Sequence, residues 1–243
     1  MKTLFVTGTD TGVGKTWVSC LIIRKLRSHG LRVGAYKPVC SGASADPHGN
    51  LQWDDVESLS RACGTNPPLD LVCPQRFVAP VAPNVAARLQ GRCVDDRLLS
   101  TGIDFWRAQA DWLIVEGAGG VYCPLSDARS VVDLAMELNG PVVVVAANKL
   151  GVISHTRMTV AALKSCGLSV AAIILNEVHA PNEVVPAESS TPDDLAAQSN
   201  ADQLRHWIPD VRLFHCAWQA DALTVLANPP DFLNRVTIPG FPN

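Results

Sequence analysis

Residues 8–16 read GTDTGVGKT, and this stretch decides the fold that the sequence predicts. The apolar run Leu4–Thr7 before it is typical of a buried strand, and Thr16–His29 after it places apolar residues at helical spacing. A glycine-rich turn between a strand and a helix is the context of a phosphate-binding loop, because glycines let several backbone N–H groups point at an anion. We therefore expect a nucleotide to bind here.

Two side chains of the loop suit phosphate chemistry. Lys15 can reach the outer phosphates of a nucleotide, and the Thr16 hydroxyl can ligate Mg²⁺. The usual pattern G-x-x-x-x-G-K-[ST] asks for glycine where Thr9 stands, and Gly8 comes one residue early. A glycine-rich turn with a chance lysine is the alternative interpretation.

Four more short apolar runs follow, and a helical pattern over Ser154–Cys166 separates the last two. They are Val33–Tyr36, Trp112–Val115, Val142–Ala147 and Val170–Leu175. Strands rich in β-branched residues with helices between them indicate a parallel sheet that is covered on both faces. The predicted architecture is α/β, with a mostly parallel central sheet and helices on both faces, in one domain spanning residues 1–243. The carboxyl ends of its strands then share one edge, where ligands bind.

Composition narrows the classes of function. Hydrophobic residues make up 47% of the 243 residues and charged residues 18%, which excludes a disordered chain. The net charge of −3 carries no basic excess for nucleic acid or an anionic membrane surface. The eight cysteines form no C-x-x-C pair, the N-terminus lacks the features of a signal peptide, and no apolar run is long enough for a bilayer. We expect a cytoplasmic protein that binds neither nucleic acid nor membranes.

A second motif, EGAGG at residues 116–120, closes the predicted strand Trp112–Val115. An acidic side chain that ends a buried strand beside a phosphate loop is the usual second partner of Mg²⁺, which makes Glu116 a candidate ligand. The alternative is an acid at a strand-to-turn junction whose glycines serve only the turn.

Two further segments, YKPVCSG at residues 36–42 and DDVESL at residues 54–59, make the pattern specific. Together with the variant phosphate loop and VEGAGG at residues 115–120, they resemble the dethiobiotin synthetase family, ATP-dependent enzymes of the penultimate step of biotin synthesis. The resemblance runs from Leu4 to about Pro209. It implies a P-loop NTPase fold.

The resemblance also implies an unusual ring closure. The family's substrate is 7,8-diaminopelargonate, one amine of which takes up CO₂ to form a carbamate. The carbamate attacks the γ-phosphate of ATP and gives a carbamic–phosphoric mixed anhydride and ADP. The second amine then attacks the anhydride carbonyl, closes the cyclic urea of dethiobiotin and expels phosphate. The family implies a homodimer as well, in which the helix start at Lys149–His155 reaches across the interface to the substrate carboxylate.

Residues at matching positions take their roles from this resemblance. Those implied to act on the carbamate and the phosphates are Lys37, Lys15, Thr11 and Ser41. Those implied to bind the nucleotide are Thr11, Gly12, Val13, Gly14, Lys15, Thr16, Glu116, Gly119 and Asn176. Those implied to ligate Mg²⁺ are Thr16, Asp55 and Glu116. Asp54, next to Asp55, would be a helix cap or a solvated acid.

Other interpretations remain open on the sequence. A ParA/MinD-like ATPase switch normally carries a lysine early in the loop, where Thr9 and Asp10 stand here. An amidating relative such as cobyrinate a,c-diamide synthase carries a glutaminase domain, for which 243 residues leave no room. A degenerate nucleotide-binding relative is a further alternative, because the family pattern near the base is degraded at residues 214–218.

Overall fold

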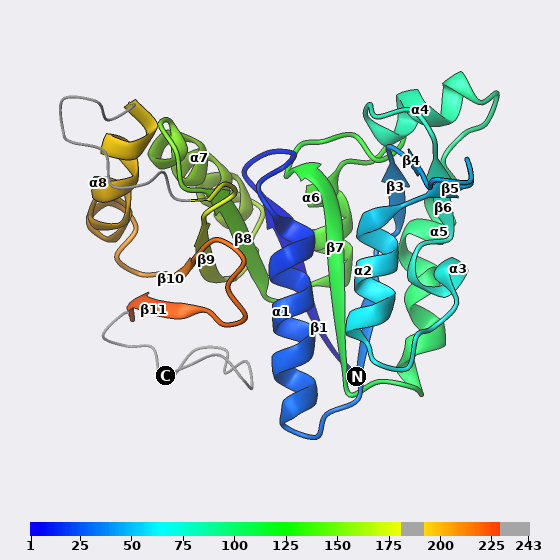
Figure 1. Cartoon of the computed structure of the whole chain (residues 1–243), viewed down its shortest axis with the longest axis horizontal. Helices are drawn as coiled ribbons and strands as arrows, with labels where there is room; N and C mark the ends of the chain where they lie inside the picture. The colour runs from blue at the N-terminus through cyan, green and yellow to red at the C-terminus, as the bar shows by residue number, and fades with distance from the viewer. Residues whose placement is uncertain (181–191, 229–243) are drawn as a thin grey trace.

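The computed structural model describes residues 1–180 and 192–228, and its centre is a seven-stranded sheet in the order β11-β10-β9-β8-β1-β7-β2 (Figure 1). The strands of this sheet are β1 (Lys2–Gly8), β2 (Val33–Tyr36), β7 (Trp112–Gly120), β8 (Val142–Ala147), β9 (Val170–Asn176), β10 (Arg212–Cys216) and β11 (Thr224–Ala227). All neighbouring pairs from β2 to β10 are parallel, and only β11 runs antiparallel, against β10. The predicted α/β architecture is therefore confirmed.

Helices cover both faces of the sheet. The helices are α1 (Lys15–Ser28), α2 (Asp54–Ala62), α3 (Leu69–Val72), α4 (Pro83–Leu89), α5 (Asp96–Thr101), α6 (Val131–Leu138), α7 (Val152–Ser165) and α8 (Pro192–Trp207), with a 3-10 turn at Gly102–Arg107. In Figure 1, α1 lies in front of β1 and β7, and α6 lies behind them. Because both faces are covered, the central strands are apolar throughout: every residue of β8 is buried.

The strand order gathers the functional motifs at one edge. The central strand β1 ends at Gly8 and lies between β7 and β8, so its carboxyl end is flanked by those of its neighbours. Figure 1 shows these ends together at the top of the molecule, beside the start of α1. The sequence segments after β1, β2 and β7, which are far apart along the chain, therefore meet in space.

Short elements beyond β2 frame the same edge. Strand β3 (Val39–Ser41) pairs in parallel with β6 (Gln75–Phe77), and the hairpin of β4 (Ser44–Ala45) and β5 (Leu51–Gln52) leads into α2. In Figure 1 these short strands lie at the upper right of the molecule, beside α2 and beyond β7. Within the described residues, no helix combines the length and the apolar character needed to cross a membrane.

Candidate active site

The phosphate loop is built from glycines in left-handed conformations. Gly12 has φ of 73° and Gly14 has φ of 88°, values that favour glycine over residues with a Cβ. A Cβ on Gly14 would lie 2.1 Å from Asn176 Nδ2, so this position excludes a side chain for lack of space as well. No side chain caps the start of α1 after Gly14. The N–H groups of this turn are therefore available to an anion.

Two lysines from different segments lie at the loop. Lys15, at the start of α1, is 8% exposed, and its Nζ donates a hydrogen bond of 2.8 Å to the backbone oxygen of Asp10. Lys37, directly after β2, is 4% exposed and contacts two carboxylates, Glu116 Oε1 at 2.8 Å and Asp55 Oδ2. Both ammonium groups are thus held inside the protein, at the edge where the strands end.

Glu116 is the hub of the polar cluster beneath the loop. Its Oε1 accepts hydrogen bonds from Lys37 and from the Thr16 hydroxyl at 2.8 Å, and its Oε2 accepts one of 2.7 Å from the Ser19 hydroxyl. The residue is 1% exposed. A buried carboxylate needs such partners to remain charged, because burial without them is costly.

The charge states follow from these contacts. Burial on its own would lower the pKa of Lys37, but the carboxylates of Glu116 and Asp55 outweigh it and hold that pKa well above its ordinary value. Burial would raise the pKa of Asp55, and the Lys37 ammonium with neighbouring hydrogen bonds brings it below its ordinary value instead. Burial lowers the pKa of Lys15, against the attraction of Glu116. Lys37 and Asp55 are consequently an ion pair at neutral pH.

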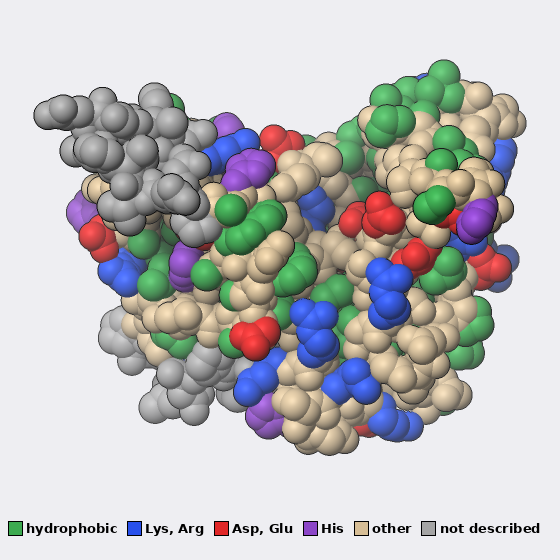
Figure 2. Space-filling view, in the orientation of Figure 1, with side chains coloured by type: hydrophobic (Ala, Val, Ile, Leu, Met, Phe, Trp, Pro, Cys, Tyr) green, Lys and Arg blue, Asp and Glu red, His purple; other side chains and the backbone are tan. Residues whose placement is uncertain are grey.

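A cavity of about 600 Å³ opens above this cluster. Figure 2 shows a recess near the top centre of the molecule, beside the raised right-hand part, with Lys or Arg and Asp or Glu side chains exposed in it. The predicted residues that line the cavity are Thr11, Gly12, Gly14, Lys15, Thr16, Lys37, Ser41, Asp55 and Gly119. Residues that the motifs did not single out for this site also line it: Trp17, Cys40, Ala118 and Cys123.

The remaining predicted residues lie at the borders of the cavity. Glu116 is beneath it, and Val13 is buried, with its backbone oxygen accepting a bond of 2.9 Å from Asn176 Nδ2.

Ser41 donates its hydroxyl to the backbone oxygen of Val81 at 2.6 Å. Asp54 is the first residue of α2, is exposed and accepts a bond from the Ser44 hydroxyl at 3.2 Å, so of the two alternatives, helix cap or solvated acid, it fits the solvated acid.

The donor set fits Mg²⁺. Thr16, Asp55 and Glu116 supply hard oxygens, the ligands that Mg²⁺ prefers. The two carboxylates already contact one cation, the Lys37 ammonium, and the Thr16 hydroxyl donates to Glu116. No group of three or more His, Cys, Asp or Glu side chains suited to a metal occurs in residues 1–180 and 192–228. A metal here would therefore depend on phosphate and water oxygens as well.

Sequence reasoning missed Ser19. The only available signal was its position on α1, three residues after Thr16 and thus on the same face of the helix. Ser19 is fully buried and reaches the second oxygen of Glu116, so it helps to hold the carboxylate in one orientation.

Replacing Ser19 with alanine is expected to lower the free energy of unfolding by about 1–3 kcal/mol, because Glu116 Oε2 loses its donor in a buried place. Urea unfolding measures the loss. Ser28→Ala is the matched control, since Ser28 lies exposed at the end of the same helix, where its hydroxyl bonds to the Lys25 backbone oxygen and contacts His29 Nδ1 at 3.5 Å. Equal changes in the two variants would show that the Ser19–Glu116 bond does not matter for stability.

Comparison with known proteins assigns the family. The model of the family described as AAA domain matches residues 2–212. The ATP-dependent dethiobiotin synthetase BioD of Anaeromyxobacter sp. (strain Fw109-5) is 40% identical over 205 residues, which cover 84% of this chain and 88% of that relative. The chain belongs to the dethiobiotin synthetase family. The BioD of Anaeromyxobacter sp. (strain K) is 41% identical, with 87% and 92% of the two chains covered, and BioD 1 of Escherichia coli (strain K12) is 37% identical, with 75% and 80% covered.

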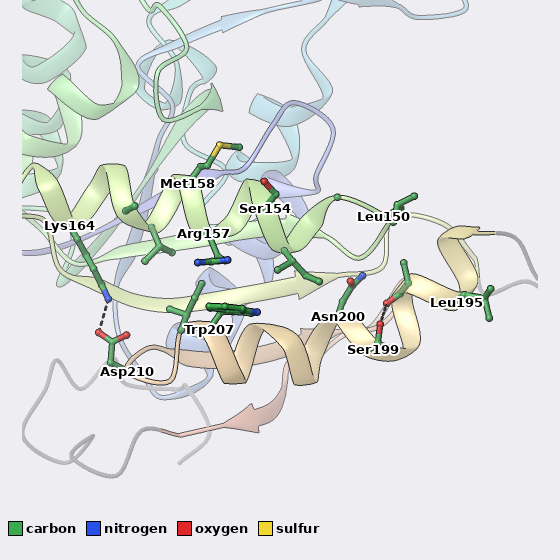
Figure 3. Close-up of a pocket in the computed structure, with 16 residues that line it drawn as sticks. Leu150, Ser154, Arg157, Met158, Lys164, Leu195, Ser199, Asn200, Trp207 and Asp210 are labelled. Atoms are coloured by element: carbon green, nitrogen blue, oxygen red, sulfur yellow. Dashed lines mark hydrogen bonds and ion pairs between the residues drawn. The ribbon is translucent and has the colours of Figure 1, made fainter.

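Membership of the dethiobiotin synthetase family confirms the predicted enzyme class, an ATP-dependent ligase that forms C–N bonds. A second cavity lies apart from the phosphate loop. That cavity, of about 1060 Å³, lies between α7 and α8, where the Arg157 guanidinium stacks on the Trp207 ring at 4.1 Å (Figure 3). None of the residues predicted to act on the carbamate, to bind the nucleotide or to ligate Mg²⁺ lines it, but four residues of the predicted carboxylate segment Lys149–His155 do: Leu150, Gly151, Ile153 and Ser154.

Proposed function

We propose that the chain closes the urea ring of dethiobiotin from 7,8-diaminopelargonate, CO₂ and ATP in the cavity at the phosphate loop. The observation that carries this proposal is the position of Lys37. Its ammonium is buried between Glu116 and Asp55 and lines the same cavity as Lys15 and the loop glycines. A carbamate and a triphosphate are both anionic, and two fixed ammonium groups offset their repulsion.

The chain's residues would act mainly by position and charge. Lys15 and Lys37 neutralise the oxygens between the carbamate and the γ-phosphate, where negative charge spreads as the phosphoryl group moves. The Ser41 hydroxyl and the Thr11 hydroxyl and backbone lie at the cavity wall, where they can meet carbamate or phosphate oxygens. No residue needs to form a covalent bond, since the carbamate and the second amine are the nucleophiles.

The proposed ligands of Mg²⁺ are Thr16, Asp55 and Glu116. Bound there with phosphate oxygens, Mg²⁺ would supply neutralising charge to the triphosphate. The contact of both carboxylates with the Lys37 ammonium supports this assignment, because it marks a place that suits positive charge, and the Thr16 hydroxyl bonds to one of these carboxylates. Ser19 would then orient Glu116 from behind.

Asn176 is the proposed contact for the nucleotide base. Its Nδ2 is committed to the Val13 oxygen, while its Oδ1 is buried and accepts no hydrogen bond from the described residues. This acceptor suits a base with an exocyclic amino group, such as adenine. A base that presents a carbonyl there would leave two acceptors facing each other.

Nucleotides with an amino group are therefore expected to be the better substrates. ATP and CTP should show KM values roughly tenfold or more below those of GTP and UTP, because a buried acceptor left unpaired costs about 1–3 kcal/mol. Initial rates of dethiobiotin formation with each nucleotide give the comparison. Equal KM values for all four would show that Asn176 does not read the base edge.

A homodimer is the proposed assembly, with the substrate carboxylate near the start of α7. Helix N-termini bind anions, and α7 begins after Gly151 without a side-chain cap. Large apolar side chains on the same helix and just before it support a partner surface: Met158 is 60% exposed and Leu150 is 63% exposed. Sedimentation velocity at assay concentrations should give twice the chain mass, and a monomer that makes dethiobiotin at full rate would overturn this assignment.

Two broader assignments accompany this function. One nucleotide-binding domain spanning residues 1–243 is the proposed organisation, supported by the family match over residues 2–212. The cytoplasm is the proposed location, supported by eight cysteines that are all free, five of them buried.

The deciding experiment is a complete reaction. Purified protein receives 7,8-diaminopelargonate, bicarbonate, Mg²⁺ and ATP, and dethiobiotin is expected in amounts that match the phosphate released. Omitting the diamine is the control for plain ATP hydrolysis. Nucleotide binding without any dethiobiotin would instead indicate the degenerate relative.

A further inference from the structure

Trp17 is a large aromatic residue in an unusual place. It follows directly on Lys15 and Thr16, lines the cavity at the phosphate loop, and is 41% exposed. The aromatic residues of the nearby strands β1, β2 and β7, namely Phe5, Tyr36 and Trp112, are buried in the core. A half-exposed indole beside a ligand cavity offers an apolar face to whatever enters it.

The neighbours of Trp17 are those of the nucleotide base. The Trp17 side chain lies close enough to the Cys216 thiol to affect its pKa. Cys216, the last residue of β10, lies opposite Asn176, the last residue of β9, in the parallel register. Asn176 in turn contacts the Gly14 turn of the phosphate loop and carries the unpartnered Oδ1. Trp17, Cys216 and Asn176 therefore form one corner between the phosphate loop and the ends of two strands.

We propose that the Trp17 indole packs against the face of the nucleotide base while Asn176 holds its edge. The inference rests on the proposed function in one respect, that the triphosphate lies in the loop. From there the nucleotide must extend past the start of α1 to bring its base edge to Asn176, and Trp17 stands on that turn of α1. Aromatic side chains bind bases in this way because every base has a flat π face.

This contact has a defined chemical scope. Stacking tolerates any base, whereas the Asn176 acceptor distinguishes amino from carbonyl edges, so the two residues divide affinity and selectivity between them. Removing the aromatic ring should weaken the binding of nucleotides, which carry a base, and leave the binding of base-free polyphosphate unaffected. If Trp17 only packed α1 in place, its replacement would instead disturb the phosphate loop and weaken the binding of both kinds of ligand.

The test compares ATP with inorganic tripolyphosphate, each with Mg²⁺, by isothermal titration calorimetry on the full chain. Trp17→Leu keeps an apolar side chain but no ring, and it should weaken ATP binding roughly tenfold or more while tripolyphosphate changes less than about threefold. Trp17→Phe keeps a ring and should retain ATP binding within about threefold of the unchanged chain. Circular dichroism confirms that each variant is folded.

Phe105→Leu is the matched control, because Phe105 is an aromatic residue that is 45% exposed and lies outside the cavity. Its replacement should leave the affinities for ATP and tripolyphosphate unchanged. Equal weakening of ATP and tripolyphosphate by Trp17→Leu, or undiminished ATP binding, would overturn the proposal. So would a loss in Trp17→Phe as large as that in Trp17→Leu. The measurement needs no diamine and no turnover, so a failure to make dethiobiotin would not be mistaken for a failure of the stacking contact.

Discussion

Replacing Lys37 with methionine is expected to lower kcat for dethiobiotin formation roughly a hundred- to a thousandfold, the usual loss when one fixed electrostatic donor is removed from a reacting site. Methionine keeps most of the side-chain volume but carries no charge. The Lys37 ammonium is the one that Glu116 and Asp55 hold at the cavity floor. Rates measured at saturating ATP and diamine isolate this effect from binding, and a near-normal kcat would show that Lys37 is only structural.

The same substitution should also destabilise the fold. Glu116 has a fully buried side chain, and breaking a buried ion pair by removing one partner costs about 3–5 kcal/mol. Lys164→Met is the matched control: Lys164 pairs with Asp210 at 2.6 Å, but both side chains are more than 40% exposed, so about 0–1 kcal/mol is expected. Thermal unfolding of both variants should precede the kinetics, so that kcat is measured where Lys37→Met is folded.

The second large effect concerns the neighbouring aspartates. Asp55→Asn is expected to raise the Mg²⁺ concentration for half-maximal turnover roughly ten- to a hundredfold. Metal affinity falls by about this factor when a residue that hydrogen-bonds to a metal ligand is removed, and the loss of a ligand itself should cost at least as much. Asp54→Asn should change it less than about twofold, because Asp54 bonds to Ser44 and does not line the cavity at the phosphate loop. Titrations of Mg²⁺ at fixed ATP give both values.

The two variants control each other, since they remove the same charge from adjacent positions of α2. A larger effect in Asp54→Asn would move the proposed ligand by one position. Equal and small effects would show that α2 provides no Mg²⁺ ligand, and Thr16 and Glu116 would then be the only proposed protein ligands.

Much of the site could be predicted because its signals are local. The phosphate loop needs only consecutive residues, and its strand and helix are found at Lys2–Gly8 and Lys15–Ser28. Lys37 and Glu116 could be placed because each directly follows or lies in a strand, and parallel strand ends share an edge. Their chemical roles remain predictions.

Other parts depend on contacts that no motif records. Ser19 reaches Glu116, which is 97 residues later in the chain, and a buried serine has no pattern of its own. The Glu177 carboxylate accepts hydrogen bonds from Asn148 at 2.6 Å and contacts His215 at 3.0 Å, which ties together the ends of β8, β9 and β10. Such networks link segments 29 and 38 residues apart, so only the folded chain reveals them.

The close approach of Gly14 to Asn176 limits how the enzyme could be redesigned. Only 2.1 Å separates Asn176 Nδ2 from the place of a Cβ on Gly14, so the residue that we propose to read the base is also a wall of the phosphate loop. A larger residue at position 176 would push on the turn that binds the triphosphate. Substitutions at Trp17, which is 41% exposed and lines the cavity, are therefore expected to change nucleotide affinity more readily than substitutions at Asn176 change base preference.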